Sequence, residues 1–158
     1  MKLIQADKDR LVFHLERREK RSLCEILKLY PLVPEAYQQV SKTAQSDAIK
    51  ASQQLLEEAL AAQRQENKKQ VLAMINEPER FQETESGFHF NLSVSQLEWL
   101  LQVLNDIRVG SWIALGSPDT EKGEKILLTE QTAPYLWVME MAGYFETVLL
   151  DALNGKQG

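Results

Sequence analysis

The chain has 158 residues, of which 44% are hydrophobic and 26% charged, a composition typical of one soluble domain, here residues 1–158, with a core of its own. Its formal net charge is −5, so we expect no binding to nucleic acids and none to anionic membranes. The single cysteine, Cys24, excludes an internal disulfide, and because neither a signal peptide nor an apolar run of membrane-spanning length is found, we expect a cytoplasmic protein.

Two short strands and a helix are predicted at the start of the chain. Residues 2–5 and 10–15 are rich in apolar residues, and Asp7-Lys8-Asp9 between them fits a hairpin turn. Residues 16–30 follow a helical pattern that ends before Pro31, because proline disfavours helix at the preceding residue. The apolar stripe of this helix consists of Leu23, Ile26, Leu27 and Tyr30.

The longest uninterrupted helix is predicted over residues 47–75, which contain no glycine or proline. Residues 35–40, in the connector before it, are expected to form one additional helical turn. Residues 63–70 are polar all round, and we expect them to lie in water. The apolar positions cluster at the two ends of the helix, at Ile49, Leu55, Leu56, Ala59, Leu60, Val71, Leu72 and Ile75.

One further strand is predicted in the middle of the chain. Residues 79–87 are acidic and polar, and we expect them to form a surface loop. Residues 88–92, Phe-His-Phe-Asn-Leu, alternate between apolar and polar as a strand does. This strand is expected to pair with the N-terminal hairpin in a three-stranded antiparallel sheet, which needs helices against its apolar face.

The strongest apolar helical pattern covers residues 93–115. Ser93 and Gln96 form a capping box at its start, and Ser95 with Glu98 is the alternative. Gly110 costs roughly 1 kcal/mol relative to alanine inside a helix, so we expect it to permit the close approach of another backbone. The apolar stripe consists of Leu97, Leu100, Leu101, Leu104 and Ile107, widened by Trp99, Val103, Ile113 and Leu115.

The last predicted helix covers residues 133–153 and follows a polar loop at 119–130. The fold class predicted from these elements is α+β and mainly α: a bundle of about four helices with a small three-stranded antiparallel sheet. Helices 94–115 and 133–153 are expected to pack as an antiparallel pair, with helix 18–30 and the first part of 47–75 against them. The stripe of the last helix consists of Tyr135, Val138, Met139, Ala142, Phe145, Leu149 and Ala152.

The second half of the chain resembles a known bacterial family. The residues that carry the resemblance are Leu-Asn-Asp-Ile-Arg at 104–108, Trp99-Leu100 before them, and the pattern of the last helix at Tyr135-Leu136 and at 149–153. They are similar to the bacterial domain of unknown function numbered twenty-seventeen, most clearly over residues 88–153. The resemblance implies a small, α-rich soluble protein with no established activity, and some family members are encoded near a protease adaptor.

Polar residues interrupt the apolar helix at Asn105, Asp106 and Arg108, just before Trp112. These four residues are the candidate binding site for a ligand or a partner. On a helix Asp106 lies about 200° from Arg108, so the polar side chains do not converge on one point. The favoured interpretation is a structural network in which Arg108 or Asp106 pairs with a charge on a neighbouring helix. The candidate partners are Glu140 and Glu146.

The histidines and the charged run near the start of the chain favour structural roles. His14 and His89 fall on predicted strands that are neighbours in the sheet, but no cysteine or carboxylate stands at matching ligand spacing, so we predict no metal site. In the run 16–21, Arg17 and Arg21 lie one turn apart, which fits a phosphate or an acidic partner. The interleaved glutamates favour a solvated helix face instead.

No motif for catalysis or for a cofactor occurs in the sequence: there is no Ser/His/Asp order, glycine-rich phosphate loop, CxxC or HExxH. We therefore favour a non-catalytic interaction or adaptor-like module, with Trp99, Trp112 and Trp137 as core or interface anchors. Its partner would be another protein or a second copy of the chain in a homo-oligomer. The alternative is a small-ligand binder or enzyme with its site around Asn105, Asp106, Arg108 and Trp112.

Overall fold

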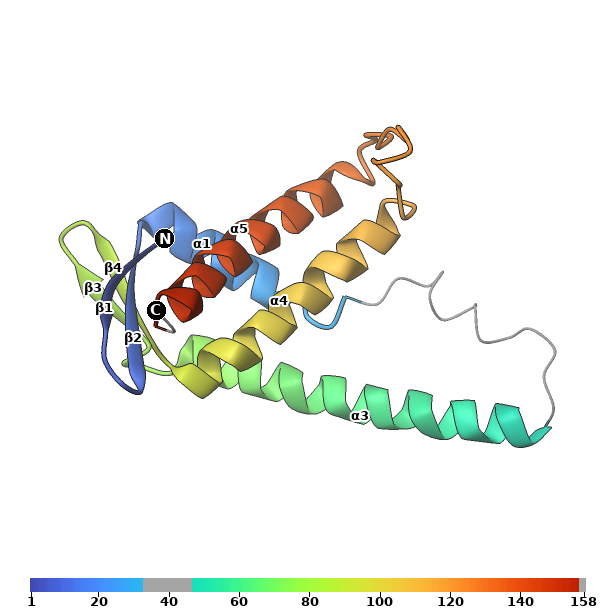
Figure 1. The fold of residues 1–158 in the computed structure, drawn as a ribbon, viewed down its shortest axis with the longest axis horizontal. Helices are drawn as coiled ribbons and strands as arrows, with labels where there is room; N and C mark the ends of the chain where they lie inside the picture. Colours follow the sequence, from blue (N-terminus) through green and yellow to red (C-terminus); the bar gives the residue numbers. More distant parts are fainter. Residues whose placement is uncertain (33–46, 157–158) are drawn as a thin grey trace.

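Residues 1–32 and 47–156 are described by the computed structural model, and they form a four-stranded sheet and four helices (Figure 1). The mainly α, α+β class is therefore confirmed, whereas the turn predicted at residues 35–40 lies outside the described residues. The strands are β1 (Lys2–Ala6), β2 (Arg10–Leu15), β3 (Phe81–Thr84) and β4 (Gly87–Ser93). The helices are α1 (Arg17–Lys28), α3 (Asp47–Asn76), α4 (Val94–Ala114) and α5 (Ala133–Lys156).

The sheet has four antiparallel strands in the order β1-β2-β4-β3, so the prediction of three strands is wrong. The additional strand is β3, in the segment 79–87 for which the sequence predicts a surface loop. Phe81 of β3 pairs with Phe90 of β4, and the two rings stack with their centroids 4.7 Å apart. Cross-strand aromatic pairs stabilise a sheet, and this contact compensates for the polar residues that fill the rest of β3.

The predicted pairing of the N-terminal hairpin with the strand at 88–92 is confirmed. β1 pairs with β2, with a shift in register between Leu3 and Gln5, and β2 pairs along its whole length with β4. Helices α1, α4 and α5 contribute to the same hydrophobic core as one face of the sheet. The buried residues on that face are Leu11, Phe13, Leu15, Phe90 and Leu92.

α4 and α5 form the predicted antiparallel pair (Figure 1). α4 begins at the predicted capping box, in which Ser93 Oγ accepts a hydrogen bond from the backbone N–H of Gln96 at 3.1 Å and the Gln96 side chain accepts one from the backbone N–H of Ser93 at 2.9 Å. The apolar stripes that the sequence predicts meet between the two helices. Their buried members are Leu97, Leu100, Val103, Leu104 and Ile107 from α4 and Val138, Ala142, Phe145, Leu149 and Ala152 from α5.

The last turns of α3, rather than its first part, pack against the other helices, so that prediction is wrong. Val71 and Met74 are buried, and the Asn67 side chain accepts a hydrogen bond from Trp99 Nε1 at 3.2 Å and donates one to Tyr30 Oη at 3.1 Å. Toward its N-terminus α3 diverges from α4 (Figure 1). An apolar pattern in a helix does not specify which other element covers that helix. In the first part of α3 the apolar side chains stay exposed: 49% at Ile49, 68% at Leu55, 60% at Leu56 and 45% at Leu60.

Candidate functional site

The four predicted binding residues lie in the second half of α4, but they face two different hollows. Asn105 and Asp106 line a hollow between α3 and α4, which we call the inner hollow. Arg108 and Trp112 line a hollow between α4 and α5, which we call the outer hollow. The four side chains therefore do not converge on one point, as the geometry of a helix with about 100° per residue predicts.

The inner hollow has a volume of about 500 Å³ and is formed by three segments that are far apart in sequence. These segments are the end of α1 with the two residues Pro31 and Leu32, the middle of α3, and the second half of α4. The lining is about half apolar, and polar side chains of α3 and α4 supply the other half. The apolar side chains in it are Pro31, Leu32, Leu60, Val109 and Ile113.

Gly110 lets the chain after α1 lie directly against α4. A Cβ atom at this position would lie 2.2 Å from the carbonyl oxygen of Leu32 and 3.2 Å from its carbonyl carbon. Any larger residue would push the two segments apart, since real Cβ atoms do not approach a backbone oxygen so closely. The close backbone approach predicted for this glycine is confirmed, and the backbone involved is that of Leu32.

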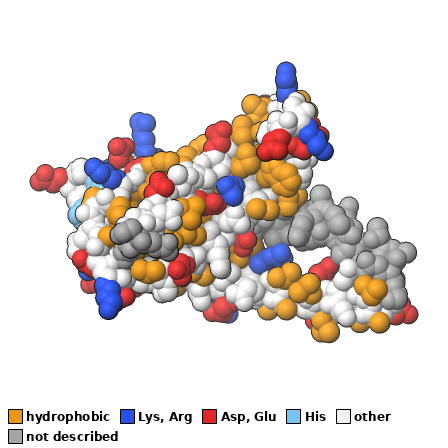
Figure 2. Space-filling model, viewed as in Figure 1, with side chains coloured by type: hydrophobic (Ala, Val, Ile, Leu, Met, Phe, Trp, Pro, Cys, Tyr) orange, Lys and Arg blue, Asp and Glu red, His pale blue; other side chains and the backbone are white. Residues whose placement is uncertain are grey.

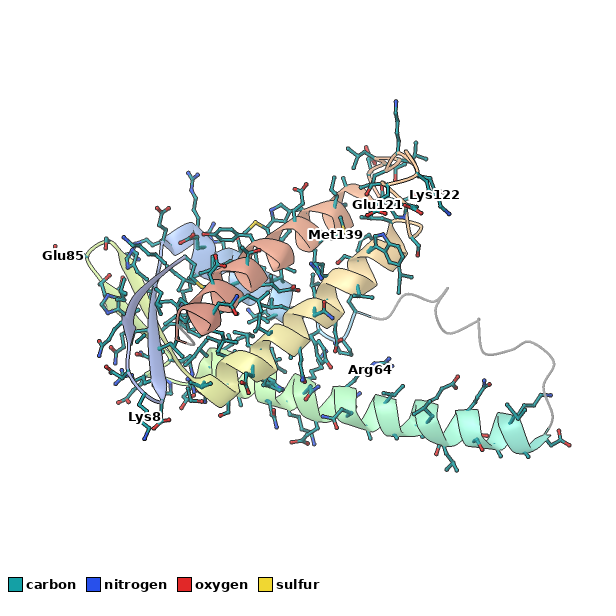
Figure 3. All side chains as sticks on the ribbon, viewed as in Figure 1. Lys8, Arg64, Glu85, Glu121, Lys122 and Met139 are labelled. Carbon is teal, nitrogen blue, oxygen red and sulfur yellow. The ribbon has the colours of Figure 1, made fainter. Side chains whose placement is uncertain are left out.

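Two opposite charges line the inner hollow from facing helices, Arg64 on α3 and Asp106 on α4. Figure 3 labels Arg64 on the side of α3 that faces α4. Burial raises the pKa of Asp106 above its ordinary value, and the positive charge of Arg64 lowers it in part. The distance between the Arg64 guanidinium and the Asp106 carboxylate exceeds that of an ion pair. Both groups are therefore available to polar atoms of a bound molecule.

Arg108 takes part in the structural network that the sequence favours. Its Nη2 donates a hydrogen bond to Asn105 Oδ1 at 3.1 Å, and its Nε lies 3.6 Å from Glu146 Oε1. Of the two predicted partners, Glu146 is thus the one that pairs. Glu146 is only 6% exposed, and its Oε1 accepts no hydrogen bond from the described residues. Burial raises the pKa of this carboxyl, and Arg108 only partly lowers it.

Trp112 connects α4 to the loop that follows it. Its Nε1 donates a hydrogen bond to the carbonyl oxygen of Pro118 at 3.1 Å, while 40% of the residue stays exposed. Val109, one turn earlier, is 43% exposed. A partly exposed tryptophan beside an exposed valine is typical of the anchors of a protein interface.

The two histidines of the chain lie opposite one another on neighbouring strands of the sheet. His14 and His89 are direct cross-strand partners, with their ring centroids 6.0 Å apart, and they alternate with the core residues of β2 and β4. Within residues 1–32 and 47–156, no three or more His, Cys, Asp or Glu side chains are placed to hold a metal ion.

Sequence reasoning missed the part of the site that comes from α3 and from the chain after α1. Leu60 and Arg64 fall in or next to the stretch expected to lie in water, and Leu32 belongs to the connector. One signal could have found the α3 contribution. The row of Val71 and Met74 continues toward the N-terminus through Asn67 and Leu60, at spacings of three, four and seven residues.

Comparisons of the chain with protein-family models, curated proteins and solved structures find no match. The resemblance to the domain numbered twenty-seventeen thus stays a prediction that rests on the residues quoted for it. No helix within the described ranges is both long enough and apolar enough to cross a membrane.

Proposed function

We propose that this chain is a non-catalytic module that binds an amphipathic helix of another protein in the groove between α3 and α4. The observation that carries the proposal is an apolar row on α3, which we call the inner face and define by Ile49, Leu56 and Leu60. This row continues the buried pair Val71 and Met74. We place the module in the cytoplasm because of its single cysteine.

The inner face lies on the same side of α3 as the buried residues. At about 100° per residue, Ile49, Leu56 and Leu60 fall within about 60° of Val71 and Met74 around the helix axis. The described residues cover Val71 and Met74, but they leave roughly half of each inner-face side chain exposed. Figure 2 shows apolar side chains along this projecting part of α3 and over the nearby ends of α4 and α5.

The projecting part of α3 would gain stability from a partner. Isolated helices shorter than about 12–15 residues are marginal in water, because most helical stability in proteins comes from the packing of an apolar face. The inner face extends over about 16 Å from Ile49 to Leu60, at about 1.5 Å per residue. A partner helix of three turns would cover this length.

α4 supplies the wall of the groove opposite Leu60 and Arg64. Val109 and Ile113 present apolar side chains there, and Asp106 faces Arg64 of α3 across it. A helix that docks in such a groove uses apolar anchors spaced three, four and seven residues apart. Polar residues beside those anchors would pair with Arg64 and Asp106 and fix the direction in which the helix lies.

One observation favours the alternative function, a small-ligand site around Asn105, Asp106, Arg108 and Trp112. The inner hollow, at about 500 Å³, falls within the range of roughly 300–1,000 Å³ that is common for ligand pockets. Such a ligand would contact Asn105 and Asp106 but not the outer hollow, where Arg108 and Trp112 lie. Helix binding accounts for the exposed apolar row as well, so it is our first proposal.

A library of amphipathic helical peptides, displayed on phage and selected on the wild-type chain, tests this proposal. The affinity of each selected peptide is measured for the wild type, for the double variant Leu56→Glu/Leu60→Glu, and for Leu72→Glu. Leu72 is a matched control, since it is 39% exposed on another side of the same helix. We expect the double variant to bind at least about tenfold more weakly than the other two, because docking would bury unpaired carboxylates.

Amide chemical shifts of the labelled chain then locate the bound peptide. The proposal expects shifts over residues 47–64 and 102–113, on the two walls of the groove. It fails if the selected peptides perturb the sheet instead, or if the double variant binds them as tightly as the wild type does. A metabolite that co-purifies with the wild type and is lost from Asp106→Asn would favour the small-ligand alternative.

A further inference from the structure

α1 faces a second hollow, which we call the basic hollow, between α1, the end of α3 and β4. Its volume is about 540 Å³. Four cations and one carboxylate of α1 line it, an excess of three positive charges in a chain whose net charge is −5. These residues are Arg17, Lys20, Arg21 and Lys28, with Glu25 as the carboxylate.

Glu16 and Glu19, which alternate with the cations in the sequence run 16–21, do not line the basic hollow. Glu16 and Glu19 form the capping box of α1, in which Glu19 Oε2 accepts a hydrogen bond from the backbone N–H of Glu16 at 2.8 Å. Glu19 Oε1 accepts a hydrogen bond from Tyr144 Oη of α5 at 2.6 Å. At about 100° per residue Glu19 lies opposite Arg17 and Arg21 around the helix, so it does not neutralise their face.

Aromatic rings of the sheet hold two of the cations in position. Lys20 Nζ lies 4.2 Å from the ring centroid of Phe88 and 5.2 Å from that of Phe81. The Arg17 guanidinium lies 5.6 Å from the Phe88 centroid and donates a hydrogen bond to Glu83 at 2.9 Å. Such cation–π contacts restrain a long side chain, so part of the positive charge is organised before any ligand arrives.

Arg21 and Lys28 are the two cations of the basic hollow that have neither a carboxylate partner nor an aromatic ring beside them in the described residues. Both are exposed, and among the described residues no carboxylate lies within ion-pair distance of either. A guanidinium presents a planar fork of donors that matches the oxygens of a phosphate, and an ammonium adds a point charge. We propose that the basic hollow binds a compact phosphate-bearing anion, with Arg21 and Lys28 on its oxygens and Lys20 as a fixed neighbouring charge.

The size and setting of the basic hollow suit a small anion better than a nucleic acid. Binding to a polynucleotide requires a track of cations along its backbone, whereas here the cations are gathered in one hollow of an acidic chain. Ile75 and Phe88 add apolar surface to the lining, and this surface would contact the organic part of a phosphate ester. This site is separate from the groove between α3 and α4, so it does not depend on the function proposed above.

The first test is calorimetric titration of the full chain with inorganic pyrophosphate at low salt, with citrate as a carboxylate polyanion for comparison. The test variant is Arg21→Gln/Lys28→Gln. The matched control, Arg18→Gln/Lys125→Gln, removes the same charge at exposed residues outside the hollow. We expect the test variant to bind pyrophosphate at least about tenfold more weakly than the control, because it loses two charge-assisted contacts.

Cys24 provides a second readout, because it lines the basic hollow and is the single cysteine of the chain. Bound pyrophosphate should slow the alkylation of Cys24 by iodoacetamide in the wild type and the control but not in the test variant. Three outcomes overturn the proposal: citrate binding as tight as pyrophosphate binding, equal affinity in the two double variants, or no protection of Cys24 at saturating pyrophosphate. Unchanged circular dichroism of both variants ensures that a loss of binding is not a loss of fold.

Discussion

Replacement of Gly110 by alanine tests how firmly the chain after α1 is held against α4. The added Cβ would lie 2.2 Å from the Leu32 carbonyl oxygen, and ordinary contact begins at 3.4 Å, so the two segments must separate by about 1.2 Å. Overpacking of this kind costs about 1–3 kcal/mol. The change from glycine to alanine inside a helix contributes about 1 kcal/mol in the opposite direction. We therefore expect the free energy of unfolding to fall by about 1 kcal/mol.

Urea unfolding followed by circular dichroism measures this change, and Gly143→Ala is the matched control. Gly143 also lies inside a helix, but a Cβ there would meet Arg108 Cδ at 3.9 Å, an ordinary contact. The control should therefore gain up to about 1 kcal/mol, and the two variants should differ by about 2 kcal/mol. Equal gains in both would refute the reasoning, because Leu32 would then yield to the new methyl group without cost.

Further predictions concern the network on α4 and α5 and the core beneath it. Arg108→Ala should lower the free energy of unfolding by about 2 kcal/mol at neutral pH and by less in acid, where the buried Glu146 carboxyl is protonated. Glu146→Gln should raise the melting temperature at neutral pH but not in acid. The pKa of the Glu146 carboxyl is raised in the folded state, so this group destabilises the fold only at a pH above the ordinary pKa of a glutamate. Burial, assisted by the hydrogen bond to Glu19, raises the pKa of Tyr144 from 10.0 to about 12. The stability that Tyr144 contributes is therefore complete below its ordinary pKa and is lost as the pH rises through 12. In a series of melting temperatures measured at increasing pH, Tyr144→Phe should remove this alkaline loss. Phe145→Ala should cost about 3–5 kcal/mol in urea unfolding, since this ring is fully buried.

The helices could be predicted because each carries its own evidence in the local sequence. α1 and α4 show apolar spacings of three and four residues, and Ser93 with Gln96 marks the start of α4 within four residues of chain. β3 could not be predicted in this way. It has four residues, of which only Phe81 is strongly apolar, and its stability comes from stacking on Phe90 of another strand, which periodicity within β3 does not show.

The candidate site was predictable only to the extent that it lies on one helix. Asn105 and Asp106 could be named from the polar interruption of α4, and the helical angle separates Asp106 from Arg108. The opposing wall of the inner hollow is supplied by α3. The position of α3 relative to the other helices is determined by contacts between residues that are distant in sequence. One such contact is Asn67 between Tyr30 and Trp99, and no local pattern specifies it.

The two outer strands of the sheet restrict how this molecule can associate. β3 is only four residues long and carries Glu83, while the register shift within β1 distorts the opposite margin. Short, charged or irregular margins of this kind discourage edge-to-edge pairing with strands of other chains, and hence aggregation. Growth of the sheet beyond four strands is therefore disfavoured, and we expect any contact with other macromolecules to involve the helical side.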